Sequence, residues 1–202
     1  MKLLVLAKSS KHGNYCLAGL NLDTYKFVRI LGSGEYGAFL DSDCKLDNGK
    51  KISLLDCIEI NLKKENDNHA QTENYSCVSK TATYCCKYSY QRLIDLYQDT
   101  LITDSFVKKS EPIGYLTRNN YKTVSHSLEL IKVNNLTVYP NWTCSFDFKG
   151  EKYCFMKITD FNFKNKSCNY SCAYLLVSLS GEDRYTLENN KFYVFVSSIF
   201  VD

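Results

Sequence analysis

The residues best suited to bind an anion lie close together near the N-terminus. Lys8, Ser10, Lys11 and His12 fall within five positions, and Arg29 follows in an apolar stretch that predicts a nearby strand. Ammonium, guanidinium and hydroxyl groups are the donors with which proteins bind phosphate. If antiparallel strands bring Arg29 beside this turn, the five residues form a phosphate-binding group. The alternative is an exposed turn that carries ordinary surface lysines.

A second polar group spans six positions in the middle of the chain. It contains His69, Gln71, Glu73 and Asn74. Amides and a carboxylate at alternate positions are suited to hydrogen bonds with the edge of a base. The alternative is a loop whose side chains bind the local backbone.

Two further features of the second half bear on binding. Trp142, the one tryptophan, is suited either to stack on a base or to pack between two domains. Lys157 and Asp160 lie near the end of one predicted strand, where we expect a structural ion pair.

Three glycines, Gly32, Gly34 and Gly37, spell G-x-G-x-x-G after an apolar run. A protein kinase also needs a V-A-I-K lysine, an H-R-D catalytic loop and D-F-G, and the sequence contains none of them. A Rossmann loop needs a helix after its third glycine, whereas AFLDSDCKLDNGKK has no helical period. We therefore predict that these glycines supply turn geometry rather than a nucleotide-binding loop.

Other catalytic and metal-binding patterns are missing as well. The chain has no G-x-S-x-G, H-E-x-x-H or P-loop. Cys168 and Cys172 have the spacing of half a zinc site, but no second pair matches them and the three histidines are scattered. We expect no catalytic residues, no cofactor and no metal, and an enzyme is the third hypothesis.

The elements that must position these residues are predicted to be mainly β-strands. The 202 residues include 16 Tyr and 11 Phe but only two Pro, a composition that favours uninterrupted strands. Short apolar runs alternate with turn signals, including SSKHGN near the N-terminus and GEDRYTLENN near the C-terminus, which is typical of barrels. TCSFDFKGEKYCF predicts a hairpin with its turn at Lys149 and Gly150. One helix is predicted near 89–99, where apolar residues recur at helical spacing.

The chain length and rhythm predict two small domains, residues 1–104 and 105–202. A net charge of +3 and a pI near 8.2 are mild, so any phosphate contacts must come from local clustering. The first residues lack the pattern of a signal peptide, and no apolar run reaches the roughly 20 residues that span a bilayer. We expect a cytoplasmic protein, no membrane partner, and ten cysteines that are mostly reduced.

Several blocks, in their order, resemble the family of dual OB-containing domains. They are LVLAKSSKHGNYCLAGLNL, TYKFVRIL, HAQTENYSCV, SLELIKV, KITDFNF and LLVSLSGEDRY followed by FYVFVSSIF, which together cover nearly the whole chain. The resemblance implies two tandem OB-like β-barrels in a bacterial protein, often encoded beside defence genes. OB barrels bind oligonucleotides or oligosaccharides on the face of strands 2 and 3 and on adjoining loops, so the step to function is an analogy of fold.

Two functions remain open at this point. The first is a non-catalytic module that binds single-stranded nucleic acid or a nucleotide, for which a bacterial defence system is one setting. The alternative is a protein-interaction or scaffold module that docks onto an effector encoded nearby. Binding that weakens with salt favours the first, and co-purification with a neighbouring gene product favours the second.

Overall fold

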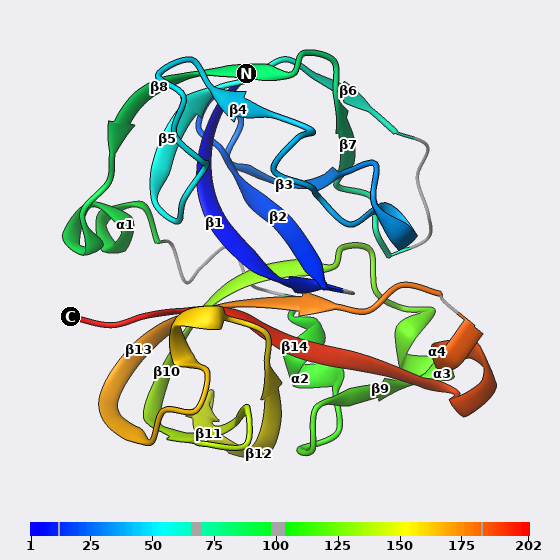
Figure 1. The fold of residues 1–202 in the computed structure, drawn as a ribbon. Helices are drawn as coiled ribbons and strands as arrows, with labels where there is room; N and C mark the ends of the chain where they lie inside the picture. The colour runs from blue at the N-terminus through cyan, green and yellow to red at the C-terminus, as the bar shows by residue number, and fades with distance from the viewer. Residues whose placement is uncertain (12, 66–69, 98–103, 183) are drawn as a thin grey trace. The chain divides into compact units, whose positions relative to one another are not determined.

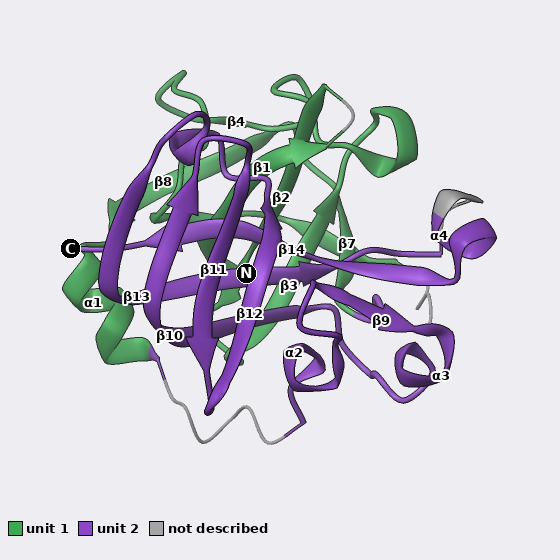
Figure 2. Ribbon diagram, turned by 90° about the horizontal axis from the view of Figure 1, so that it is seen from below, with its two compact units in different colours: residues 1–67, 73–96 green, residues 68–72, 97–202 purple. Residues whose placement is uncertain are grey.

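A computed structural model of the chain describes residues 1–11, 13–65, 70–97, 104–182 and 184–202, and the ribbon is shown in Figure 1. The chain divides into two compact units, coloured separately in Figure 2. Unit 1 comprises residues 1–67 and 73–96, and unit 2 comprises residues 68–72 and 97–202. The sequence predicts a domain boundary between residues 104 and 105, and this boundary stays a prediction.

The regular elements of unit 1 are mostly strands. Its helical elements are the short η1 (Glu35–Gly37) and α1 (Tyr90–Leu96). Its strands are β1 (Lys2–Lys11), β2 (Asn14–Asn21), β3 (Lys26–Leu31), β4 (Lys45–Leu46), β5 (Asp56–Glu59), β6 (Leu62–Lys64), β7 (Asn74–Cys77) and β8 (Thr81–Lys87). The sheet order is β4-β8-β5-β1-β2-β3-β7-β6, and β3 runs parallel to β7.

The sheet of unit 1 curls back on itself because β5 and β6 are two halves of one bent run. Ile60 N donates to Met1 O at 3.0 Å, so the first half continues the pairing with β1. The carbonyl of the next residue, Asn61, accepts from Val78 N at 3.0 Å, so the second half continues the pairing with β7. We count β5 and β6 as one strand and leave aside β4 and β8, which pair on the far side of β5. Then β1, β2, β3, the joined β5–β6 and β7 are strands 1 to 5 of the unit, and their order is 1-2-3-5-4 and back to strand 1. Apolar side chains of these strands, including Leu3 and Ile58, form the core of the unit.

Unit 2 carries more helical elements around its strands. The helical elements are α2 (Phe106–Lys109), α3 (Arg118–Tyr121), η3 (Phe161–Phe163) and α4 (Arg184–Asn189). The strands are β9 (Tyr115–Thr117), β10 (Leu128–Tyr139), β11 (Thr143–Phe148), β12 (Glu151–Ile158), β13 (Cys168–Leu179) and β14 (Lys191–Phe200).

Five strands of unit 2 close into a barrel. The sheet order is β12-β11-β10-β13-β14-β9, and a parallel pairing of β12 with β14 joins the two sides. Numbered from β10, the strands follow one another around the barrel as 1-2-3-5-4-1, which is the order found in unit 1. Inward side chains fill the barrel, among them Phe146 and Tyr153, whose stacked rings have centroids 5.5 Å apart.

The mainly β architecture with two OB-like barrels confirms the fold expected from the sequence. The β11–β12 hairpin turns where expected, with φ of +48° at Lys149 and +85° at Gly150. Two local expectations were wrong. Most of SSKHGN continues the β1–β2 ladder instead of forming a turn, and GEDRYTLENN contains α4. In the first segment, pairing with β2 overrides a polar composition that by itself favours a loop. In the second segment, α4 packs against β14.

Candidate nucleic-acid interface

The basic residues near the N-terminus lie along the β1–β2 hairpin. Ser10 pairs with Tyr15 and Lys11 with Asn14, so both are strand residues and both are half-buried. His12 lies outside the described residues. The hairpin therefore displays Ser10 and Lys11 along a ladder rather than gathering them in an anion-binding loop.

Lys8 is committed to partners inside unit 1. Its Nζ donates to Asp41 Oδ1 at 2.9 Å and to Ile52 O at 3.1 Å, and it lies 4.3 Å from the centroid of the Tyr15 ring. Lys51 also binds Asp41, at 2.7 Å. Burial acts to raise the pKa of Asp41, but hydrogen bonds from Lys51 and Lys8 outweigh it and hold the pKa below its usual value. Any anion that recruited Lys8 would therefore have to compete with this carboxylate.

Arg29 lies beside part of the second polar group rather than beside Lys8. Because β3 and β7 are parallel neighbours, Arg29 and Asn74 are directly paired across the two strands. The backbone N–H of Arg29 donates to Glu73 O at 2.8 Å, and its guanidinium lies 3.9 Å from Cys16 Sγ. All three residues, Arg29, Glu73 and Asn74, are almost fully buried, with exposures of 5 to 6%. The structure thus brings together residues from two groups that the sequence treats separately.

Gln71, another member of the second group, is assigned to a different unit from Glu73 and Asn74. Gln71 belongs to unit 2, where its side-chain amide lies against Gly181, 2.9 Å from the position that a Cβ would take. His69 lies outside the described residues.

The three glycines form a self-contained turn after β3. Gly32 N donates to Gly37 O, Gly34 N to Ala38 O, and Gly37 N to Gly34 O, at 2.9 to 3.1 Å. Asp43 accepts from Ser33 N and Leu40 N, which closes the turn further. A phosphate loop presents its N–H groups outward to the ligand, whereas these are used within the turn.

A surface of aromatic and lysine side chains crosses the outside of the unit 2 barrel. Cross-strand pairing places Tyr139, Thr143, Lys157 and Phe195 in one row over β10, β11, β12 and β14. The adjacent row, Val138, Cys144 and Met156, is fully buried, so the first row points away from the core. We call the full surface the aromatic–lysine stripe, and its members are Tyr115, Tyr139, Phe155, Lys157, Lys191, Tyr193 and Phe195.

Neighbouring rings and ammonium groups of the stripe contact one another along the surface. Lys157 Nζ lies 5.0 Å from the Tyr193 ring centroid, and Lys191 Nζ lies 4.8 Å from that of Tyr115. Ring centroids are 6.4 Å apart for Tyr115 and Tyr193 and 6.3 Å apart for Tyr193 and Phe195. Phe155, 61% exposed, lies 5.7 Å from Tyr139. Lysines set among partly exposed rings combine cation–π contacts with open stacking faces.

Trp142 lies in the turn between β10 and β11, at one end of the same barrel. Its ring centroid is 6.4 Å from that of Phe161, which is 42% exposed. Lys164 Nζ lies 5.4 Å from the centroid of the Trp142 ring. In an OB barrel this turn joins strands 1 and 2, one of the two loops that flank the binding face. Trp142 therefore repeats, in a loop, the pairing of rings with lysine seen on the stripe.

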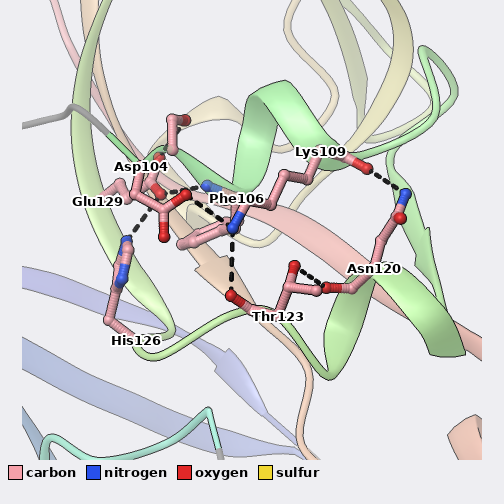
Figure 3. A network of polar contacts seen from close by, with 8 residues as sticks. Asp104, Phe106, Lys109, Asn120, Thr123, His126 and Glu129 are labelled. Carbon is pink, nitrogen blue, oxygen red and sulfur yellow. Dashed lines mark hydrogen bonds and ion pairs between the residues drawn. The ribbon is translucent and has the colours of Figure 1, made fainter.

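A polar network near the start of β10 has a structural role (Figure 3). The buried carboxylate of Glu129 accepts from Ser105 Oγ at 2.7 Å and Phe106 N at 2.6 Å, and His126 Nε2 lies 2.9 Å from it. Lys109 binds Asp104 at 2.7 Å. Because donors surround the carboxylate, the network anchors the start of α2 to β10.

The ten cysteines are all free thiols in this structure. Among the described residues, no cluster of three or more His, Cys, Asp or Glu side chains has the arrangement of a metal site. Within the same residues, the helices are too short or too polar for any of them to cross a bilayer.

The strand order of both units, with the third and fifth strands parallel, defines a protein of two OB-type barrels. The chain matches the family described as the dual OB-containing domain over residues 1–199 and belongs to that family. Comparisons with curated proteins and with solved structures returned no match.

Sequence reasoning singled out Trp142 but missed the stripe. The signal available was the alternation of Lys191, Tyr193 and Phe195 with the apolar residues between them. The ion pair expected between Lys157 and Asp160 does not form, because each side chain has other partners. Lys157 lies over the Tyr193 ring, and Asp160 accepts from Asn162 N at 2.9 Å and from Ile199 N at 3.0 Å.

Proposed function

We propose that this protein is a non-catalytic module that binds single-stranded nucleic acid on the aromatic–lysine stripe of unit 2. The observation that carries the proposal is the row Tyr139, Thr143, Lys157 and Phe195, which continues to Tyr193 and Tyr115. Proteins that bind single strands without strong sequence preference pair aromatic stacking platforms with basic groups along the backbone. Two lysines and five rings supply both in one place.

The position of the stripe on the barrel supports the same function. β11 and β12 are the second and third strands of the OB order, whose outer face is the usual binding face of this fold. Trp142 lies in the loop between the first two strands and extends the stacking surface at one end. Phe155 is 61% exposed, which a purely structural role does not need, and the other four rings of the stripe are half-buried.

Single strands fit this surface better than duplexes do. A duplex presents mainly its phosphates and groove edges, and it hides the base faces that rings stack on. The stripe offers two lysines, too few for the phosphate neutralisation on which duplex binding depends. We therefore infer a preference for unpaired bases, with little discrimination among sequences.

The proposal is tested by direct binding. Labelled single-stranded DNA and RNA of about 15 nucleotides, near the upper site size of one OB fold, are titrated at about 50 mM and about 200 mM salt beside the matching duplex. Saturable binding of the single strands, weaker at the higher salt, supports the proposal. Equal or tighter binding of the duplex contradicts it. The absence of binding also contradicts it, and favours a module that docks onto a protein.

Photo-crosslinking then locates the contact. Ultraviolet irradiation of the complex, followed by digestion and mass spectrometry, is expected to attach nucleotides to peptides that carry Phe155, Tyr193 or Trp142. Crosslinks confined to the β1–β2 hairpin or to the surroundings of Arg29 would move the site to unit 1 and overturn the assignment to the stripe.

A further inference from the structure

A β-bulge in unit 1 gathers three cysteines. In the antiparallel pairing of β5 with β8, Cys57 lies opposite Cys86 and Ile58 opposite Tyr84, so Cys85 is the extra residue. In a bulge, two residues of one strand oppose a single residue of the other. Here Cys85 and Cys86 both oppose Cys57, although adjacent residues of a regular strand point to opposite faces.

The three thiols interact, and their exposure is graded. Burial raises the pKa of Cys57 to about 11, and the neighbouring thiols of Cys86 and Cys85 act in the same direction. Cys57 is only 3% exposed, whereas Cys86 is half-buried and Cys85 is exposed. One thiol is therefore protected, and two lie where a small reagent in solution can reach them.

The register beside the cluster is held by a second pair. Asp56 and Lys87 lie opposite each other at the next position along the same strands, and Lys87 Nζ binds Asp56 Oδ1 at 3.2 Å. Directly opposed residues of antiparallel strands have Cα atoms about 4.5 to 5.5 Å apart, which lies within the range of about 4.4 to 6.8 Å that disulfides span. A bond between Cys57 and Cys86 therefore needs little backbone movement.

We propose that this bulge is a thiol oxidation site, at which a low-molecular-weight disulfide such as oxidised glutathione converts Cys57 and Cys86 into an intramolecular disulfide. The Cys86 thiolate attacks one sulfur of the small disulfide and releases one thiolate, which leaves a mixed disulfide. Cys57 loses its proton to solvent, attacks the Cys86 sulfur and expels the second small thiolate. Two protein thiols lose two electrons and two protons, and the small disulfide is reduced to two thiols.

Mass spectrometry of the full chain tests the site. After incubation with oxidised glutathione at about pH 8, where the thiolate fraction of cysteine is appreciable, the intact mass is expected to fall by two hydrogens. Peptide mapping is expected to join Cys57 to Cys86, and dithiothreitol is expected to reverse the change. Oxidised wild-type protein in which Cys57 carries no disulfide overturns the proposal.

Serine variants assign the partner. Cys86→Ser is expected to abolish the Cys57 crosslink, whereas Cys85→Ser is expected to keep it. Cys172→Ser, which removes a half-buried cysteine of unit 2, is the matched control and is expected to behave as wild type. An equal yield of Cys57 crosslink in Cys86→Ser overturns the assignment. The wild-type map also separates this pair from Cys44 and Cys77, two other thiols in mutual contact, so the result does not depend on any variant folding.

Discussion

Replacement of Phe155 by alanine removes the most exposed ring of the aromatic–lysine stripe. The side chain is 61% exposed and contacts Tyr139 at a centroid distance of 5.7 Å. Stacking of one base on an aromatic ring is worth about 1 to 3 kcal/mol in alanine substitutions. At about 1.4 kcal/mol per factor of ten, Phe155→Ala is expected to weaken binding of a single strand by about 5- to 140-fold.

The fold should tolerate this change. Because Phe155 is largely exposed, its removal is expected to alter the free energy of unfolding by no more than about 0.5 kcal/mol. Its φ of +56° costs alanine no more than it costs phenylalanine, since both carry a Cβ. Thermal unfolding monitored by circular dichroism therefore accompanies the binding assay, which is fluorescence anisotropy of a labelled oligonucleotide at about 50 mM salt.

Tyr25 provides a matched control in unit 1. It is 57% exposed and has a φ of +54°, so Tyr25→Ala removes a ring of similar exposure from a similar backbone conformation. Tyr25→Ala is expected to bind as wild type. If Phe155→Ala binds as tightly as wild type, or if both variants weaken binding equally, the stripe is not the stacking surface and our reasoning from exposure and register is refuted.

Three further outcomes follow from the structure. With two lysines on the stripe, Lys157 and Lys191, the slope of log K against log salt is expected to be about −1.4, and Lys157→Ala should halve it; an unchanged slope would exclude a phosphate contact there. Gly34→Ala places a Cβ 2.8 Å from Ala38 O and is expected to destabilise the fold by about 1 to 3 kcal/mol in denaturant titrations. ATP is expected to bind neither the wild type nor this variant, and an unaltered unfolding midpoint would count against the tight turn. Burial acts to raise the pKa of Asp43, but hydrogen bonds from Leu40 N and Ser33 hold this pKa below its usual value, so the carboxylate stabilises the fold at neutral pH and this contribution is lost as the pH falls below about 4. The free energy of unfolding of Asp43→Asn should therefore fall less steeply with pH in acid than that of the wild type, and an identical pH dependence would contradict this assignment.

Local pattern predicts much of the fold. The alternation of Phe146, Asp147 and Phe148 and the Lys149–Gly150 turn specify the β11–β12 hairpin, because strand period and turn geometry are properties of neighbouring residues. The helix predicted near 89–99 is α1, Tyr90–Leu96, where apolar spacing again acts within a few residues. The missing kinase and Rossmann partners were likewise visible in the sequence, since those motifs need particular residues at particular spacings.

The candidate sites depended on pairings between distant segments. The sequence by itself determined a β-rich chain with abundant aromatic rings, enough predicted strands for two barrels, and a glycine turn without the catalytic residues of a kinase. Only the tertiary structure decided that parallel β3–β7 pairing sets Arg29 beside Asn74, that β12–β14 pairing sets Lys157 beside Phe195, and that a bulge turns two cysteines toward Cys57. The physical reason is that a strand's own sequence sets which residues alternate, whereas the register with its neighbour sets which of them meet, and in a closed barrel that neighbour lies tens of residues away.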